Sequence, residues 1–467
     1  MVLLSWQMYL GTEKLMPQGS IYMERKIEGT VRSWFMRGDT HPLLIHGARR
    51  TGKTSAIEHV GQELVGKEFV ELDFQTDLET IERIFDGPTD DLNRITSRIA
   101  EYKRLALSPE HTLLFFDEVQ LSEKALNSLR FFADSPWRVI ASGSLLGVTT
   151  KNRQLPFPSG VRQLEMHPMD FEEFLWAFGE KPMANAIREH ARSCEPYVLH
   201  ERALDLYHHF LVVGGMPKPL REWIETGSLD AAMDELAEID ATYTADMTDP
   251  ENGISGISAK RIWDSLPMQL LRASTKKFKY ADVVRGGRRS RLLEPLEWLE
   301  AAGIVTRNEL TKDTHAPLSP YNDEEGSYFK VYVADTGVMF KKFGIAPSLF
   351  RDTASVAQLS SDFRGALAEN FVMQSLRANS IKTFYWMPDE DSSRGEVDFI
   401  FQNDRAEVVP IEVKSARNVR ARSLKHLMAS GGSPYAIRLS EQNFSRNTSE
   451  EGIELRALPL YAAFAIE

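Results

Sequence analysis

The sequence predicts an α/β protein of several domains, and three observations carry this prediction. A short apolar run at residues 43–45 leads into a glycine-rich segment and then a helical pattern. A second apolar run, 112–116, ends in two carboxylates, as a central strand of a parallel sheet can. Near the C-terminus, two segments alternate apolar and charged residues as strands do. The length of 467 residues indicates about three domains.

The glycine-rich segment, residues 47–54, fits the phosphate-binding loop pattern G-x-x-x-x-G-K-[ST]. Its glycines let backbone N–H groups surround a phosphate, and the following helix adds the positive end of its dipole. We expect Lys53 to reach the β- and γ-phosphates of ATP and the Thr54 hydroxyl to hold Mg²⁺. The alternative is a glycine-rich turn that matches by chance. The expected nucleotide contacts of this segment are Gly47, Arg49, Arg50, Thr51, Gly52, Lys53, Thr54 and Ser55.

Two later strand ends supply further candidates for the nucleotide site. Asp117 would complete the magnesium shell, and Glu118 would orient or activate the attacking water as a catalytic residue. The strand at 138–144 ends in small polar residues, so Ser142 or Ser144 would contact the γ-phosphate. Alternatively, both serines are ordinary turn residues.

Composition narrows the class of protein. A single cysteine, Cys194, excludes a disulfide framework and favours a reducing compartment, which we expect to be the cytoplasm. No apolar stretch approaches the ~18 residues of a membrane span, so we expect no membrane partner. The N-terminus lacks the features of a signal peptide. The net charge of −12 argues against a general nucleic-acid coat, although a local basic patch stays compatible with it.

The order of motifs resembles the bacterial and archaeal ATPases that join an AAA-type domain to a C-terminal domain of unknown function. The resemblance rests on residues 47–54, 116–120, 141–146, 167–175 and 213–217. It implies an AAA-type core at 21–168 and a helical lid at 169–250, after an N-terminal extension at 1–20. The family places a basic residue directly after a glycine upstream of the motif at 167–175, as an arginine finger. Here Val161 follows Gly160 and Arg162 comes one position later, so Arg162 is either the finger or a surface arginine.

The segment 251–325 reads as a winged helix, with helices at 260–272, 280–284 and 288–302 before a strand at 304–307. It also holds the concentrated positive charge of the chain. Basic residues at the start of a recognition helix favour contact with nucleic acid, and we expect that nucleic acid to be DNA. The alternatives are a protein–protein adaptor and a solvated charged face. The basic residues are Lys276, Lys277, Lys279, Arg285, Arg288, Arg289 and Arg291.

The C-terminal segment, 326–467, holds a second set of chemical residues. A helix places Glu369 on a partly apolar face, and two strands contribute Asp398 and then Glu412 with Lys414. This order resembles the PD-(D/E)XK nucleases and implies a restriction-endonuclease-like α/β domain. Asp398 and Glu412 would be metal ligands, and Glu369 would either complete the metal shell or orient a metal-bound water; all three are candidate catalytic carboxylates. Lys414 would position or polarise the attacking water. Alternatives are an ordinary Glu412–Lys414 ion pair, or a nuclease fold without activity.

Two functions remain open from the sequence. In the first, ATP hydrolysis drives a machine that engages DNA and cuts it with a Mg²⁺-dependent C-terminal site. In the second, an ATP-controlled switch or scaffold binds nucleic acid or protein without cutting it. A homo-oligomer is an open possibility, because AAA-type sites commonly complete one another across subunits.

Overall fold

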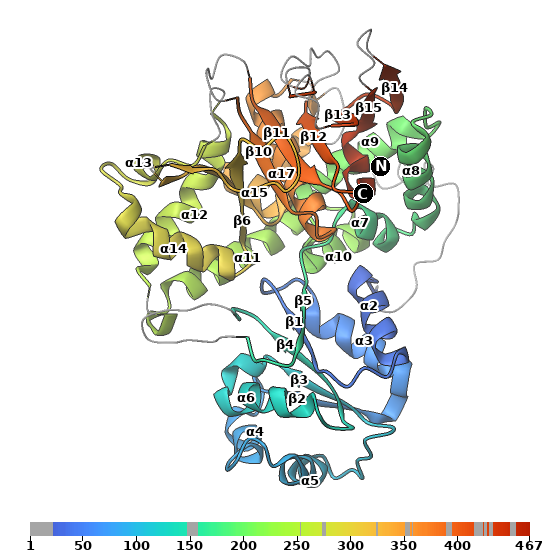
Figure 1. The fold of residues 1–467 in the computed structure, drawn as a ribbon, viewed down its shortest axis with the longest axis vertical. Coiled ribbons are helices and arrows are strands. Elements are labelled where there is room, and N and C mark those ends of the chain that lie inside the picture. Colours follow the sequence, from blue (N-terminus) through green and yellow to red (C-terminus); the bar gives the residue numbers. More distant parts are fainter. Residues whose placement is uncertain are drawn as a thin grey trace.

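The computed structural model describes residues 22–467 except 147–156, 253, 273–276, 324–325, 351–354, 357, 389–394, 415–423, 425–426, 429–432 and 449–453. The expected N-terminal extension and the basic residue Lys276 lie outside the described residues. Figure 1 shows a smaller sheet in the lower part of the view and a larger sheet above it, both covered by helices. The predicted α/β class is confirmed.

The lower sheet is parallel throughout and has the order β2-β3-β4-β1-β5. The apolar runs form β1, β3 and β4 as predicted. Helices α2 and α3 bury one face of the sheet, and α4–α6 bury the other. The carboxyl ends of β1, β3 and β4 therefore meet at one edge, where α/β proteins bind ligands. The bounds are α2 Lys26–Met36, β1 Leu43–His46, α3 Lys53–Val65, β2 Phe69–Asp73, α4 Leu78–Ile84, α5 Leu92–Lys103, β3 Leu113–Asp117, α6 Glu123–Phe132, β4 Arg138–Gly143 and β5 Arg162–Glu165.

A helical layer follows β5 and packs on the C-terminal half of the chain. Its centre is aromatic: the ring of Phe171 contacts Phe371 and Phe464 from distant segments. These helices and the upper sheet share one hydrophobic core. The layer is therefore fixed to the C-terminal half. Its helices are α7 Phe171–Ala177, α8 Lys181–Ser193, α9 His200–Val213, α10 Pro217–Thr226 and α11 Leu229–Thr248.

The next segment confirms the three predicted helices and the strand after them. They are α12 Gly256–Leu270, α13 Tyr280–Val283, α14 Arg289–Ala301 and β6 Val305–Thr311, followed by the hairpin β7 Asn322–Asp323 and β8 Gly326–Ser327. Strand β6 pairs antiparallel with β9, Phe329–Val333, and parallel with β10, Thr383–Trp386. The segment expected as a winged helix thus shares its sheet with the C-terminal segment.

The upper sheet has eight strands in the order β14-β15-β13-β12-β11-β10-β6-β9. The predicted helix α17 packs on it, and the two predicted charged strands form the adjacent antiparallel pair β11 and β12. The remaining bounds are α15 Thr336–Phe343, α17 Ser361–Ala378, β11 Val397–Gln402, β12 Val408–Val413, β13 Tyr435–Ser440, β14 Ser445–Thr448, β15 Glu454–Pro459 and a terminal 3₁₀ segment, Leu460–Ala465. Within the described ranges, no helix is long and apolar enough to cross a membrane.

Candidate functional site

The phosphate-binding loop connects β1 to α3 as predicted. Gly47 has φ +143°, and a Cβ there would lie 2.2 Å from the carbonyl oxygen of Met166. Gly52 caps α3 with φ +90°, a left-handed conformation that favours glycine. Within the loop, Arg50 also has a positive φ of 68°, and the Thr51 hydroxyl donates to the Ala48 carbonyl at 3.0 Å. Both glycines of the motif are therefore required by the backbone path.

Lys53 lies inside the loop rather than in solvent. Its Nζ donates to the carbonyl oxygens of Gly47 at 3.1 Å and Ala48 at 2.9 Å. Burial lowers the pKa of Lys53 to about 8, although the charges of Glu118 and Asp117 act in the opposite direction. The ammonium group is thus held at the centre of the loop, where burial disfavours its charged form. A bound phosphate would offset this penalty with its negative charge.

Asp117 ends β3 directly beside the start of α3. Its carboxylate accepts hydrogen bonds from the Thr54 hydroxyl, at 2.9 Å, and from the Ser142 hydroxyl. Burial raises the pKa of Asp117, and these two hydrogen bonds act to lower it. A hydroxyl and a carboxylate side by side are hard oxygen donors of the kind that Mg²⁺ takes beside nucleotide phosphates. Ser55, by contrast, is exposed in the first turn of α3.

Glu118 follows in a left-handed conformation, φ +53°, that turns its side chain away from the strand. Its carboxylate accepts from the Ser144 hydroxyl at 3.1 Å and from Gln120 Nε2 at 2.5 Å. The Glu118 N–H donates to Ser142 Oγ at 3.1 Å. The two serine hydroxyls therefore donate to different carboxylates: Ser142 to Asp117, and Ser144 to Glu118.

Arg25 is a buried residue at this site that the sequence did not single out. Its guanidinium donates to the carbonyl oxygens of Thr51, at 2.5 Å, and His167, at 2.7 Å. It also forms an ion pair with Glu173 at 3.1 Å, and both side chains are 5% exposed. One arginine therefore ties the loop to α7. Its position directly before α2 gives no periodic signal.

Residues of the helical layer and of the next segment also contact the loop. Arg49 forms an ion pair with Asp246 of α11 at 2.9 Å, and the Tyr243 hydroxyl donates to the Arg49 carbonyl at 3.1 Å. A Cβ on Gly303, after α14, would lie 3.0 Å from the backbone nitrogen of Ala48. The loop thus contacts both later segments. Arg162, the possible finger, begins β5 and pairs with the partly buried Asp39. It lies beside the start of β1, whereas the loop follows the end of that strand.

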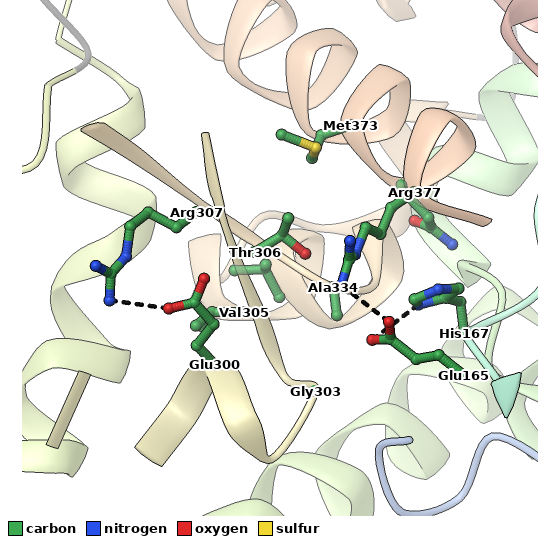
Figure 2. A pocket seen from close by; sticks show the side chains of 12 residues that line it. Glu165, His167, Glu300, Gly303, Val305, Thr306, Arg307, Ala334, Met373 and Arg377 are labelled. Atoms are coloured by element: carbon green, nitrogen blue, oxygen red, sulfur yellow. Dashed lines mark hydrogen bonds and ion pairs between the residues drawn. The ribbon is translucent and has the colours of Figure 1, made fainter. Parts of the chain in front are cut away.

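A polar cavity of about 100 Å³ lies between the end of β5 and the segments α14, β6 and α17 (Figure 2). Arg377 pairs with Glu165 at 2.9 Å, and Arg307 pairs with Glu300 at 2.8 Å. Burial lowers the pKa of His167, which also lines it, to about 4. Each arginine that lines this cavity therefore forms an ion pair with a carboxylate that also lines it.

The predicted C-terminal residues meet where β11 and β12 pair. Phe399 of β11 lies opposite Ile411 of β12, so the next pair of positions in this antiparallel register is Asp398 and Glu412. The Val413 N–H donates to Asp398 Oδ2 at 2.8 Å, and Lys414 Nζ lies 3.0 Å from Glu412 Oε1. Glu412 is 2% exposed, and among the described residues its buried Oε2 has no hydrogen-bond partner. This unsatisfied carboxylate oxygen is a chemical fit for a cation.

Glu369 contacts a tyrosine and a lysine of β9. Its carboxylate accepts from the Tyr332 hydroxyl at 3.3 Å and lies 3.8 Å from the ammonium of Lys330. Across the part of the chain that the structure describes, no three His, Cys, Asp or Glu side chains converge as a metal site. The sequence missed Lys330 because a lysine in the strand pattern of β9 reads as a solvent-facing charge.

The basic segment borders this carboxylate site. Lys277 lies over the ring of Tyr328 at 5.2 Å, and Lys312 lies over the ring of Tyr321 at 4.0 Å. The two tyrosine rings stack with centroids 6.3 Å apart. Burial lowers the pKa of Lys277, against the nearby charge of Glu396. The predicted basic residues beyond it are exposed: Lys279, Arg285, Arg288, Arg289 and Arg291.

Three parts of the chain match known protein families. Residues 39–175 match the family described as AAA domain, residues 204–348 match a domain of unknown function (DUF8612), and residues 364–461 match another (DUF4143). No curated protein matches the sequence.

Solved structures are similar to the chain at low identity. The Walker-type ATPase PABY2304 of Pyrococcus abyssi is 15% identical, with 69% of this chain and 96% of that chain covered, at a TM-score of 0.40. AMPPCP-bound DnaA from Aquifex aeolicus is 13% identical, with 62% and 93% covered, at 0.26. The family matches alone show that the chain carries an AAA domain at 39–175 and a C-terminal DUF4143 domain at 364–461, as its motif order predicted.

Proposed function

We propose that this chain is an ATP-hydrolysing protein that engages nucleic acid and cuts it, with Mg²⁺, at the carboxylate site between β11 and β12. The observation that carries the proposal is the buried Oε2 of Glu412, which has no hydrogen-bond partner in the described part of the chain and lies beside Lys414 and Asp398. A carboxylate oxygen without a partner is costly inside a protein unless a cation completes it. Three residues of the predicted nuclease signature, Asp398, Glu412 and Lys414, lie together here, which favours cutting over binding alone.

At the ATP site, each residue has a defined task. Lys53 would bind the β- and γ-phosphates, and Thr54 with Asp117 would hold Mg²⁺. Glu118 would take a proton from the attacking water, and Ser144 orients its carboxylate. Ser142 holds Asp117 and positions the Glu118 backbone, so we assign it to positioning.

At the carboxylate site, Asp398 and Glu412 would hold Mg²⁺, which needs one or two carboxylates and retains several waters. The bound cation would polarise the phosphodiester and lower the pKa of water. Lys414 lies where its ammonium can stabilise negative charge that develops on the phosphate. Glu369 then acts on the site through its neighbours.

Nucleic acid would approach along the basic segment. Lys277 and Lys312, each over a tyrosine ring, combine positive charge with aromatic faces, which is the chemistry that binds single strands. The charge of Lys277 is coupled to Glu396, directly before β11, so this surface leads to the carboxylate site.

A second candidate function is an ATP-controlled switch without cleavage. The contacts of the phosphate loop with Asp246, Tyr243 and Gly303 favour it, because nucleotide binding would alter them directly. The same contacts would allow ATP to control cleavage in the first function.

Cleavage of labelled single- and double-stranded DNA and RNA with Mg²⁺ or Mn²⁺, with and without ATP, tests the proposal. Lys414→Ala should abolish cleavage and keep ATP hydrolysis, whereas the exposed Lys382→Ala should keep both. Lys53→Ala reports whether ATP controls cleavage. Equal product from wild type and Lys414→Ala, with ATP hydrolysis intact, would refute cutting and leave the switch.

A further inference from the structure

A lysine of β9, the last strand of the upper sheet, is buried beside the carboxylates of Glu369 and Glu396. Lys330 of β9 has no solvent exposure and forms a close ion pair with Glu396. Its Nζ lies 3.8 Å from Glu369 Oε2 and 5.2 Å from the centroid of the Tyr385 ring. A fully buried lysine is rare unless its charge is paired, so the two carboxylates explain its burial.

A row of buried polar groups connects this lysine to the proposed metal ligands. Asn308 of β6 pairs with Lys330 across the sheet and is itself fully buried. Its amide donates to the Asp398 carbonyl at 3.4 Å. Burial acts to lower the pKa of Lys330, but Glu396, Glu369 and Asp398 together hold it well above its usual value. The lysine and the ligand Asp398 therefore belong to one electrostatic cluster.

Among the described residues, the cluster holds the four carboxylates of Glu369, Glu396, Asp398 and Glu412 and the two ammonium groups of Lys330 and Lys414. The ammonium group of Lys277 also acts on Glu396. Without the positive charge at position 330, Glu369 and Glu396 would lose a buried cationic partner.

We infer that the Lys330 ammonium stands in the place of a second cation, so that the carboxylate site binds a single divalent ion. Glu369 and Glu396 are the partners of this lysine, while Asp398 and Glu412 remain for the metal. Lys330 is thus a positioning residue that sets the metal stoichiometry. The inference rests on the proposed metal site, and it explains why Glu369 does not join a three-carboxylate set.

The test is a titration of the nucleotide-free protein with Mn²⁺ alone, followed by electron paramagnetic resonance. Omitting nucleotide keeps the P-loop site from adding a phosphate-dependent ion. Wild type should bind one ion per chain at this site with an uncoupled spectrum, and Glu412→Gln should lose it. The Lys330→Met variant should bind two ions with a broadened, exchange-coupled spectrum, because Glu369 and Glu396 then need a new cation. The exposed Lys382→Met is the matched control and should bind one.

A second readout covers the case in which Lys330→Met folds poorly. Mn²⁺ should raise the melting temperature of Lys330→Met more than that of wild type, because the metal replaces the missing charge. A Lys330→Met/Glu396→Gln double variant should reduce this rescue, and Lys330→Arg should return to one ion.

The outcomes separate the two proposals. If Glu412→Gln binds as many ions as wild type, the metal site itself is refuted. One ion in wild type and an unchanged single ion in Lys330→Met would refute only the role of Lys330. Two coupled ions in wild type would also overturn that role, whether or not any variant folds.

Discussion

The buried position of Lys53 makes ATP affinity depend on pH. Its pKa is about 8 in the nucleotide-free chain, against 10.5 for an ordinary lysine. That difference corresponds to about 3 kcal/mol that disfavours the ammonium form. A triphosphate would stabilise the ammonium and raise its pKa again, so ATP binding above neutral pH should take up a proton.

The size of the effect follows from the charged fraction of Lys53. With a pKa of about 8, roughly three quarters of the molecules are charged at pH ~7.5 and roughly a tenth at pH ~9. The Kd for ATP should therefore rise about eightfold over this interval, and binding at pH ~8 should take up about half a proton. Phosphate groups, whose second pKa is near 6, are ionised throughout this window.

Isothermal titration calorimetry in buffers of different ionisation enthalpy measures both the affinity and the proton uptake. Lys53→Arg is the control, because a guanidinium stays charged across the interval and should show a nearly constant Kd. A wild-type Kd that does not change between the two pH values, with no proton uptake, would refute the proposed state of Lys53.

Three further predictions concern the surroundings of the loop. Arg25→Met leaves Glu173 buried without its cation, and should lower the free energy of unfolding by about 3–5 kcal/mol in urea titrations; a loss comparable to that of a surface substitution would contradict this. The pKa of His167 is about 4 folded and 6.5 unfolded, so the free energy of unfolding should fall by up to about 3 kcal/mol as pH drops from 6.5 to 4. His167→Gln should remove that part of the pH dependence. Gly303→Ala should raise the Kd for ATP about fivefold by displacing Ala48. The matched Gly344→Ala, with a similar positive φ and open space around it, should leave ATP affinity unchanged.

The nucleotide site could be predicted well because its signals are local. The loop sequence itself requires Gly47 and Gly52, and the apolar run before Asp117 identifies a buried strand. The division of roles between Ser142 and Ser144 could not be predicted, because it depends on the left-handed turn at Glu118. Arg25 was missed for a similar reason: its partner Glu173 lies 148 residues away.

The strands that carry the candidate C-terminal residues could be predicted, but the contacts of those residues could not. Alternation in β11 and β12 correctly placed Asp398 and Glu412 on neighbouring strands. Glu369, a candidate to complete the metal shell or orient a water, contacts Tyr332 and Lys330. Strands β6 and β9 join the C-terminal strands through the pairing of β6 with the distant strand β10, which periodicity cannot reveal. For the same reason, the sequence could not show that the basic segment borders the carboxylates.

The central claim is that Glu412 holds a cation for cutting nucleic acid. The most direct measurement is Mn²⁺-dependent cleavage of a 5′-labelled single strand by wild type and by Glu412→Gln, at equal ATPase activity. We predict product from wild type and none from Glu412→Gln. Equal product from both proteins, or none from wild type on any nucleic acid tested, would contradict the account.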